Sequence, residues 1–238
     1  MGQPADAVHN FPGRIGLVLI AATHDGFAVA GDGAQANADG TASEVQKVFQ
    51  VGKYGAIALA GSVSIQDPID RPVREEINIS RIAKTWLDSH PDAGLETANR
   101  EINSLVTQTL AKFFSTRHPG AQAGKFAFAI ICAGFVDGKP FTYGNNYFTP
   151  ISPGKAARAE KIPGDIRTGE VWVFGTVKNK LHAARPFQDF SVQEFVDLFD
   201  AALRDAESEE GKKTGSSIVA PPNRFATISV KDGFTWKK

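Results

Sequence analysis

Apolar residues in this sequence gather into short runs separated by turn residues, a pattern that predicts buried strands joined as hairpins. The first hairpin spans residues 15–30, with a His-Asp-Gly turn at 24–26 between two almost wholly apolar runs. Because these two runs leave no polar face, we expect both strands to be covered on both sides. A second hairpin spans residues 47–60, with its turn at 52–55. Further strands are expected at residues 126–135, 141–143, 171–174, 225–230 and 234–236.

Three other segments carry apolar residues at helical spacing. The first covers residues 77–87 and the second covers residues 95–114, and each ends before a proline. The third covers residues 191–207, where Ser191 and Glu194 have the spacing of a capping box. The pattern therefore predicts two consecutive helices in the middle of the chain and one helix near its end.

The order of these elements is strands, two helices, strands, one helix and strands, which favours an α+β fold with packed sheets and helices outside them. No repeat or linker divides the sequence, so we expect one domain over residues 1–238 with a short leader at 1–13. The stretch 64–74 contains two prolines and several charges, which predicts an inserted loop.

Composition narrows the possible partners. Lys+Arg and Asp+Glu both total 26, so the formal net charge is zero and nothing favours nucleic acid or an anionic membrane surface. The single cysteine, Cys132, lies in an apolar run and is expected to be a buried structural thiol, which suits a reducing compartment. No apolar run approaches the roughly 20 residues of a membrane span, and no signal peptide is visible. We expect a cytoplasmic protein without a metal or cofactor, whose partners are proteins or small molecules.

Five stretches of the sequence form a recognisable series, and they are residues 16–26, 28–33, 46–51, 58–63 and 226–234. In this order along the chain they resemble the β subunits of the proteasome and the related peptidase subunit of a bacterial ATP-dependent protease. Each stretch is short and weak alone, but the five together are specific because their order and spacing also match. The resemblance implies the fold of an N-terminal-nucleophile (Ntn) hydrolase, a four-layer αββα sandwich.

The resemblance also implies a catalytic site. In that family an N-terminal threonine attacks an amide carbonyl, and its own α-amino group serves as the general base. The assisting lysine matches Lys47, the aspartate that holds it matches Asp32, and the glycine whose N–H stabilises the oxyanion matches Gly61. The serine and aspartate that support the threonine fall near Thr176 and Glu210. A lysine and an aspartate at strand ends are usually solvated, but the surrounding match favours a paired, partly buried pocket.

The nucleophile itself has no match. Counting back from Asp32 places the threonine near Gly16, or near Pro12 if the first hairpin carries a four-residue insertion. Residues 10–17 contain no side-chain hydroxyl or thiol. The first threonine, Thr23, lies at the hairpin turn, so cleavage ahead of it would remove the first strand.

Three hypotheses follow. The first is a noncatalytic member, or pseudoenzyme, either a subunit of a homo-oligomeric ring that assembles through its helices or a protein that binds a peptide or small molecule in the relic pocket. The second is an active peptidase or amidohydrolase with a displaced nucleophile. The third is an unrelated α/β binding domain that only mimics the motifs. The missing nucleophile favours the first hypothesis, and an uncleaved leader would support it.

Overall fold

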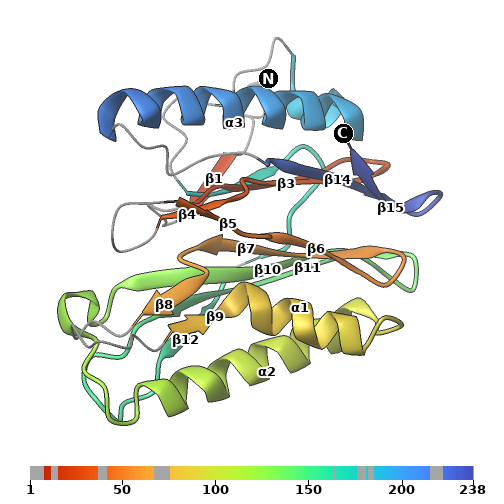
Figure 1. Cartoon of the computed structure of the whole chain (residues 1–238). Coiled ribbons are helices and arrows are strands. Elements are labelled where there is room, and N and C mark those ends of the chain that lie inside the picture. Colours follow the sequence, from red (N-terminus) through yellow and green to blue (C-terminus); the bar gives the residue numbers. More distant parts are fainter. Residues whose placement is uncertain are drawn as a thin grey trace.

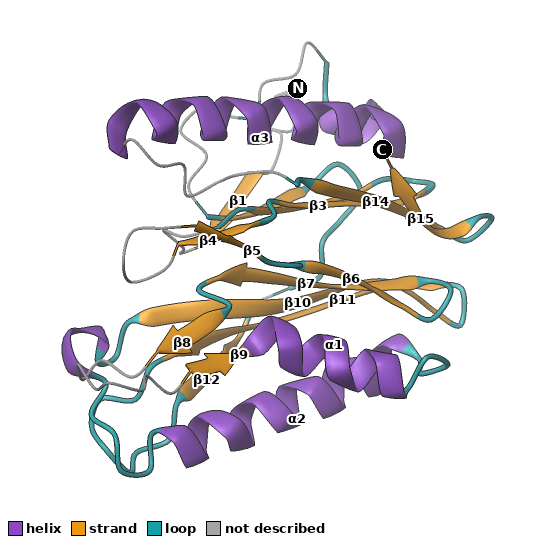
Figure 2. Cartoon of the chain, in the orientation of Figure 1, coloured by secondary structure: helices purple, strands orange, loops and turns teal. Residues whose placement is uncertain are grey.

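The fold was established from a computed structural model, which describes residues 8–11, 16–36, 42–66, 76–162, 164–175, 181, 185–214 and 222–237. Its two main sheets lie face to face, with helix α3 on the outer side of one sheet and helices α1 and α2 on the outer side of the other (Figures 1 and 2). This mixture of helices and largely antiparallel sheets confirms the α+β class that the sequence predicts.

One main sheet has six described strands, in the order β1-β13-β2-β3-β14-β15. Its pairings are antiparallel except for that between β1 and β13, which is parallel. Every residue of β2, β3 and β13 is buried, because one face of these strands packs on the other sheet and the opposite face packs on α3. The strands are β1 (Val8–Phe11), β2 (Val18–Ala22), β3 (Gly26–Gly31), β13 (Val171–Phe174), β14 (Arg224–Ser229) and β15 (Gly233–Lys237).

The other main sheet has five described strands, in the order β12-β11-β10-β7-β6, all paired antiparallel. Two short hairpins, β4–β5 and β8–β9, stand beside the main sheets. The strands of this sheet are β6 (Val48–Val51), β7 (Gly55–Gly61), β10 (Phe126–Val136), β11 (Lys139–Phe148) and β12 (Arg158–Lys161), and those of the hairpins are β4 (Ala34–Ala36), β5 (Ala42–Glu44), β8 (Ser64–Gln66) and β9 (Glu76–Asn78).

Apolar clusters fill the three spaces between the layers. Between the two sheets, one sheet contributes large side chains such as Phe27, Trp172 and Phe174, and the other contributes mainly alanines, including Ala58 and Ala129. Small residues opposite large ones let the sheets interdigitate closely. Helices α1 (Ile79–Ser89) and α2 (Leu95–Phe113) cover the second cluster, and α3 (Val192–Thr214) covers the third. Two short 3-10 helices complete the described elements, Gly120–Gln122 and Phe187–Asp189.

The structure corrects three boundaries. The first middle helix begins at Ile79 and not at residue 77, because the Asn78 side chain caps it by accepting a hydrogen bond from the Arg81 N–H at 2.8 Å. The predicted loop 64–74 is wrong at its start, since residues 64–66 form β8 and pair with β9. The rest of that loop lies outside the described residues. The last helix continues past residue 207 to Thr214.

No helix in the described part of the chain combines the length and the apolar character needed to span a membrane.

Candidate functional site

Asp32 follows directly after β3 and is fixed by the residue that precedes β2. The Leu17 N–H donates to Asp32 Oδ1 at 2.5 Å, and the Asp32 N–H donates back to the Leu17 carbonyl at 3.1 Å. These two bonds lock the carboxylate at the end of the first hairpin. The side chain of Asp32 is completely buried.

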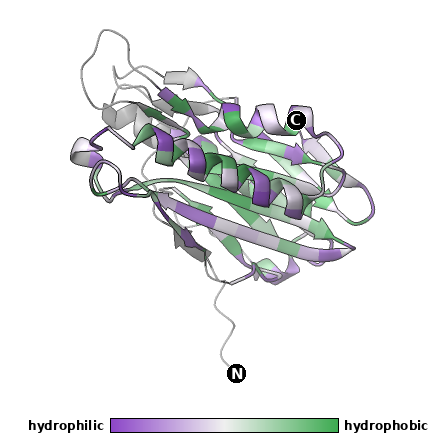
Figure 3. Cartoon of the chain, turned by 90° about the horizontal axis from the view of Figure 1, so that it is seen from below, coloured by the Kyte–Doolittle hydropathy of each residue, from purple (hydrophilic) through white to green (hydrophobic). Residues whose placement is uncertain are grey.

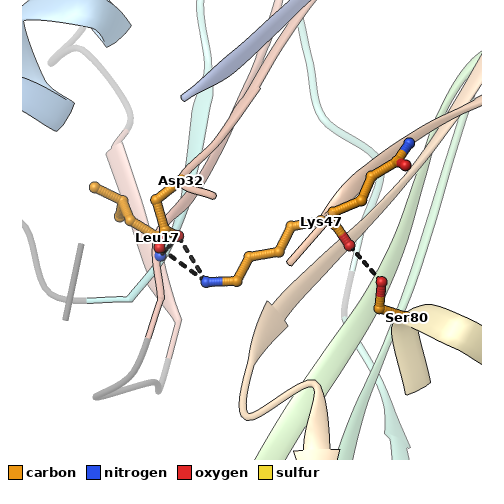
Figure 4. A network of polar contacts seen from close by, with 5 residues as sticks. Leu17, Asp32, Lys47 and Ser80 are labelled. Atoms are coloured by element: carbon orange, nitrogen blue, oxygen red, sulfur yellow. Dashed lines mark hydrogen bonds and ion pairs between the residues drawn. The ribbon is translucent and has the colours of Figure 1, made fainter. Parts of the chain in front are cut away.

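Lys47 reaches Asp32 from the opposite sheet. It immediately precedes β6, and its Nζ lies 2.9 Å from both carboxylate oxygens of Asp32 (Figure 4). Its backbone is held by the Leu59 N–H, which donates to the Lys47 carbonyl at 2.7 Å. Ser80, at the start of α1, donates from its hydroxyl to the Gln46 carbonyl at 2.7 Å. The ion pair therefore joins the two sheets, and each partner is anchored in its own sheet.

The electrostatics of this pair follow from its burial. The side chains of Lys47 and Asp32 are only 1% and 0% exposed. Burial lowers the pKa of the Lys47 ammonium from its ordinary value, while the charge of Asp32 and its hydrogen bond oppose that change. Each charge is tolerated in the interior because the other neutralises it. The sequence predicted a partly buried pocket, whereas the pair is fully enclosed.

Gly16 lies directly against the lysine. Its φ is +77°, in the left-handed region that favours glycine, and a Cβ atom added there would lie 2.3 Å from Lys47 Nζ. The same atom would lie 3.2 Å from Lys47 Cε and 3.4 Å from Asp32 Oδ1. The lysine ammonium thus occupies the space into which a side chain at position 16 would extend. Counting back from Asp32 places the missing threonine near Gly16, whereas the alternative position, Pro12, lies outside the described residues.

Three other residues were predicted for the site, and they are Gly61, Thr176 and Glu210. Gly61 is the last residue of β7. It lies two residues after Leu59, whose N–H donates to the Lys47 carbonyl. Its φ is +87°, and an added Cβ would lie 2.7 Å from the Ala127 carbonyl oxygen, which explains the glycine. Thr176 lies outside the described residues. Glu210 was expected after the third helix, but the longer α3 includes it.

Thr23, the first threonine of the sequence, has a structural role. Its Oγ1 accepts hydrogen bonds from the Asp25 and Gly26 N–H groups at 3.1 and 3.0 Å, which closes the turn of the first hairpin. It stands at the opposite end of β2 from Leu17, about 20 Å away at the rise of an extended strand. Its hydroxyl therefore cannot serve as the nucleophile beside Lys47.

Cys132 is also unsuited to a nucleophilic role. It is buried, as the sequence predicted, and burial raises the pKa of its thiol. Its Sγ donates to Asn99 Oδ1 at 3.2 Å, on the side of the five-stranded sheet that faces α2. The thiol therefore packs in a different layer from Lys47 and Asp32.

Sequence reasoning missed the two residues that position Lys47 from either side. A Cβ atom on Gly31 would lie 3.0 Å from Val48 Cγ2 and 3.5 Å from Lys47 Cβ, so glycine permits the close approach of the two sheets there. Ser80 fixes the backbone beside Lys47, as described above. The one available signal was the place of Ser80, two residues after the Asn78 cap, where polar side chains commonly bind nearby backbone groups.

No family model matches this sequence, and no curated protein matches it. The fold nevertheless matches solved structures over nearly the whole chain. Together with the arrangement of sheets and helices, these matches show that this chain shares the fold of the proteins named Anbu. One match is the Gly-1 mutant of Anbu from Hyphomicrobium sp. strain MC1, with a TM-score of 0.54 and 14% identity, covering 94% of this chain and 85% of that chain. Another structure of Anbu from the same strain has a TM-score of 0.51 and 14% identity, covering 92% of this chain and 86% of that chain.

Proposed function

We propose that this chain is a noncatalytic proteasome-like subunit in which the former catalytic pocket survives as a structural ion pair. The observation that carries the proposal is the contact between Lys47 Nζ and the Cβ position of Gly16, 2.3 Å apart. A nucleophile would have to extend from position 16 into the space that the ammonium fills. The order of layers, from α3 through two sheets to α1 and α2, supports the four-layer αββα sandwich of Ntn hydrolases.

The chemistry of the site supports the same proposal. Threonine-type catalysis needs a hydroxyl to attack and a free amine to accept its proton. Gly16 has no side chain, and its nitrogen lies within the chain because β1 precedes it. An amide nitrogen of this kind is not a base at neutral pH. The absence of both groups at one position favours a pseudoenzyme.

The lowered pKa of Lys47 is the one observation that favours an active enzyme with displaced chemistry, since a neutral lysine can act as a base or nucleophile. Against this, both oxygens of Asp32 bind the ammonium, and the lysine side chain is 1% exposed. We therefore retain the noncatalytic assignment.

A covalent probe tests this assignment. Incubation with a proteasome-directed electrophile is expected to leave the intact mass of the protein unchanged, because Gly16, which lies against Lys47, has no side-chain hydroxyl. A catalytically active proteasome treated in parallel serves as the positive control. An adduct mapped to Lys47, Gly16 or a neighbouring residue would overturn the noncatalytic assignment.

We further propose that the chain assembles into a homo-oligomeric ring through α1 and α2. A groove of about 540 Å³ lies along these helices, lined by apolar residues that include Trp86 and Leu105 and by polar residues that include Arg81. Leu105 is 38% exposed although it is a large apolar residue. Figure 3 views the molecule from the α1–α2 side, where hydrophobic and hydrophilic segments alternate along the helices. A second copy of the chain would cover this surface.

Light scattering at micromolar concentration is expected to report a mass well above the 25.5 kDa of one chain. Leu105→Glu should lower the measured mass, because a charge would enter the covered groove. Val230→Glu is the matched control, since Val230 is an exposed apolar residue at the end of β14 and outside the groove. A wild-type mass near that of one chain would refute the assembly and favour a solitary protein that binds a peptide or small molecule.

A further inference from the structure

Strand β1 lies at the edge of the six-stranded sheet, in the part of the chain that precedes Gly16. It pairs in parallel with β13, in a register that places Val8 opposite Val171 and Phe11 opposite Phe174. On its other side, β13 pairs with β2. The two strands on either side of β13 therefore come from the same N-terminal part of the chain.

The register aligns the two neighbours of β13. Phe11 at the end of β1 and Val18 at the start of β2 are both opposite Phe174, one on each side of β13. Gly175 follows at that end with a φ of +120°. A Cβ atom on Gly175 would lie 2.5 Å from the Gly16 carbonyl oxygen, so the two backbones cross in close contact.

This crossing brings the chain against the buried pair. Gly16 lies against the ammonium of Lys47, and the next residue, Leu17, donates its N–H to Asp32. Gly16 follows the end of β1 after a short segment, and Leu17 directly precedes β2. Whatever fixes β1 in the sheet also limits the movement of Gly16 away from the lysine.

We propose that β1 is a strap that keeps Gly16 and Leu17 seated on the Lys47–Asp32 pair, and that the edge of β13 is a strand-binding edge filled by β1 of the same chain. An unpaired edge of β13 would expose backbone N–H and C=O groups that β1 satisfies. This inference rests on the proposed noncatalytic function, because a retained β1 leaves no free amine at Gly16.

The accessibility of Lys47 to an amine acylating reagent tests the strap. Labelling is followed by mass spectrometry of the digested protein, with the exposed Lys84, whose side chain is 56% exposed, as the internal reference. The variant lacks residues 1–11, and its matched control lacks only residues 1–7 and keeps β1. Loss of β1 is expected to raise the labelling rate of Lys47 about tenfold or more, because the site opens more often, while the control labels like the full chain.

A peptide of residues 5–13 should restore the protection of Lys47 in the variant that lacks residues 1–11, and a scrambled peptide should not. If that variant is folded and its Lys47 labels as slowly as in the full chain, the strap is refuted. An intact mass showing that the purified protein begins beyond residue 11 also refutes it. Neither the labelling rate nor the intact mass depends on the electrophile that tests the noncatalytic function. The strap and the noncatalytic function can therefore fail separately.

If the chain that lacks residues 1–11 does not fold, a full-length variant tests the strap instead. Asn10→Cys with Val173→Cys joins two residues that the register places opposite each other. This pair is expected to form a disulfide under mild oxidation, and the oxidised form should label at Lys47 more slowly than the reduced form. Asn10→Cys with Val171→Cys, which is out of register, is the control and should not cross-link. No cross-link in the in-register variant, or equal labelling of its two forms, would refute the strap.

Discussion

Asp32→Ala is expected to lower the free energy of unfolding by about 3–5 kcal/mol, the usual effect of removing one member of a buried ion pair. The substitution removes the carboxylate that lies against the buried Lys47 ammonium, and it also removes the acceptor of the Leu17 N–H. For a chain of this size, the loss corresponds to a fall in melting temperature of about 10 °C. Thermal and urea unfolding of the purified variant measure it.

Asp88→Ala is the matched control for this prediction. Asp88 pairs with Lys84 on the surface of α1, where the two side chains are 63% and 56% exposed, so its loss should change stability by less than about 0.5 kcal/mol. The double variant Asp32→Asn with Lys47→Met keeps an acceptor for Leu17 and removes both charges. It should therefore be more stable than Asp32→Ala. If Asp32→Ala unfolds like the wild type, the pair does not support the fold.

Gly16→Thr is expected to destabilise the protein and to leave it without peptidase activity. A threonine there must adopt the left-handed conformation, which costs about 1–2 kcal/mol, and its Cβ must displace Lys47 Nζ, an overpacking that costs about 1–3 kcal/mol. The hydroxyl would be restored, but the nitrogen of residue 16 would still follow β1 in the chain. We expect a lower melting temperature and no adduct with the electrophile.

Gly94→Thr is the control for inserting a threonine at a glycine. Gly94 is the N-cap of α2, its φ is −69°, and nothing lies within 4 Å of an added Cβ. Threonine is a suitable N-cap residue, so this variant should be as stable as the wild type or slightly more stable. A Gly16→Thr protein that melted like Gly94→Thr would show that Lys47 yields the space freely.

The sequence predicted the main elements well because their apolar runs have clear periods. The first hairpin, the second hairpin and α2 all appear near their expected positions. The start of α1 was harder, since Ile77 continues the helical apolar pattern although it pairs in β9. Strand β1 gave no signal at all, because residues 8–11 are a mixture of polar and apolar types and the parallel partner, β13, is more than 150 residues away.

The candidate site was predicted in part. The motifs led to Asp32 and Lys47, and the structure places these two residues in contact. The contact of Gly16 with the lysine could not be predicted from the sequence, because it depends on a left-handed φ and on how the two sheets stack. The roles of Gly31 and Ser80 likewise arise from residues that meet only across layers.

The alanine-lined face of the five-stranded sheet affects the ion pair between Lys47 and Asp32. Ala58 and Ala129 pack against the large side chains of the opposite sheet and so set the separation between the sheets. A lysine side chain has a fixed maximum length, so the contact of Lys47 with Asp32 depends on that separation. A larger residue at Ala58 would push the sheets apart and stretch the ion pair. The length of the lysine side chain therefore limits the size of the residues that can fill the space between the two sheets.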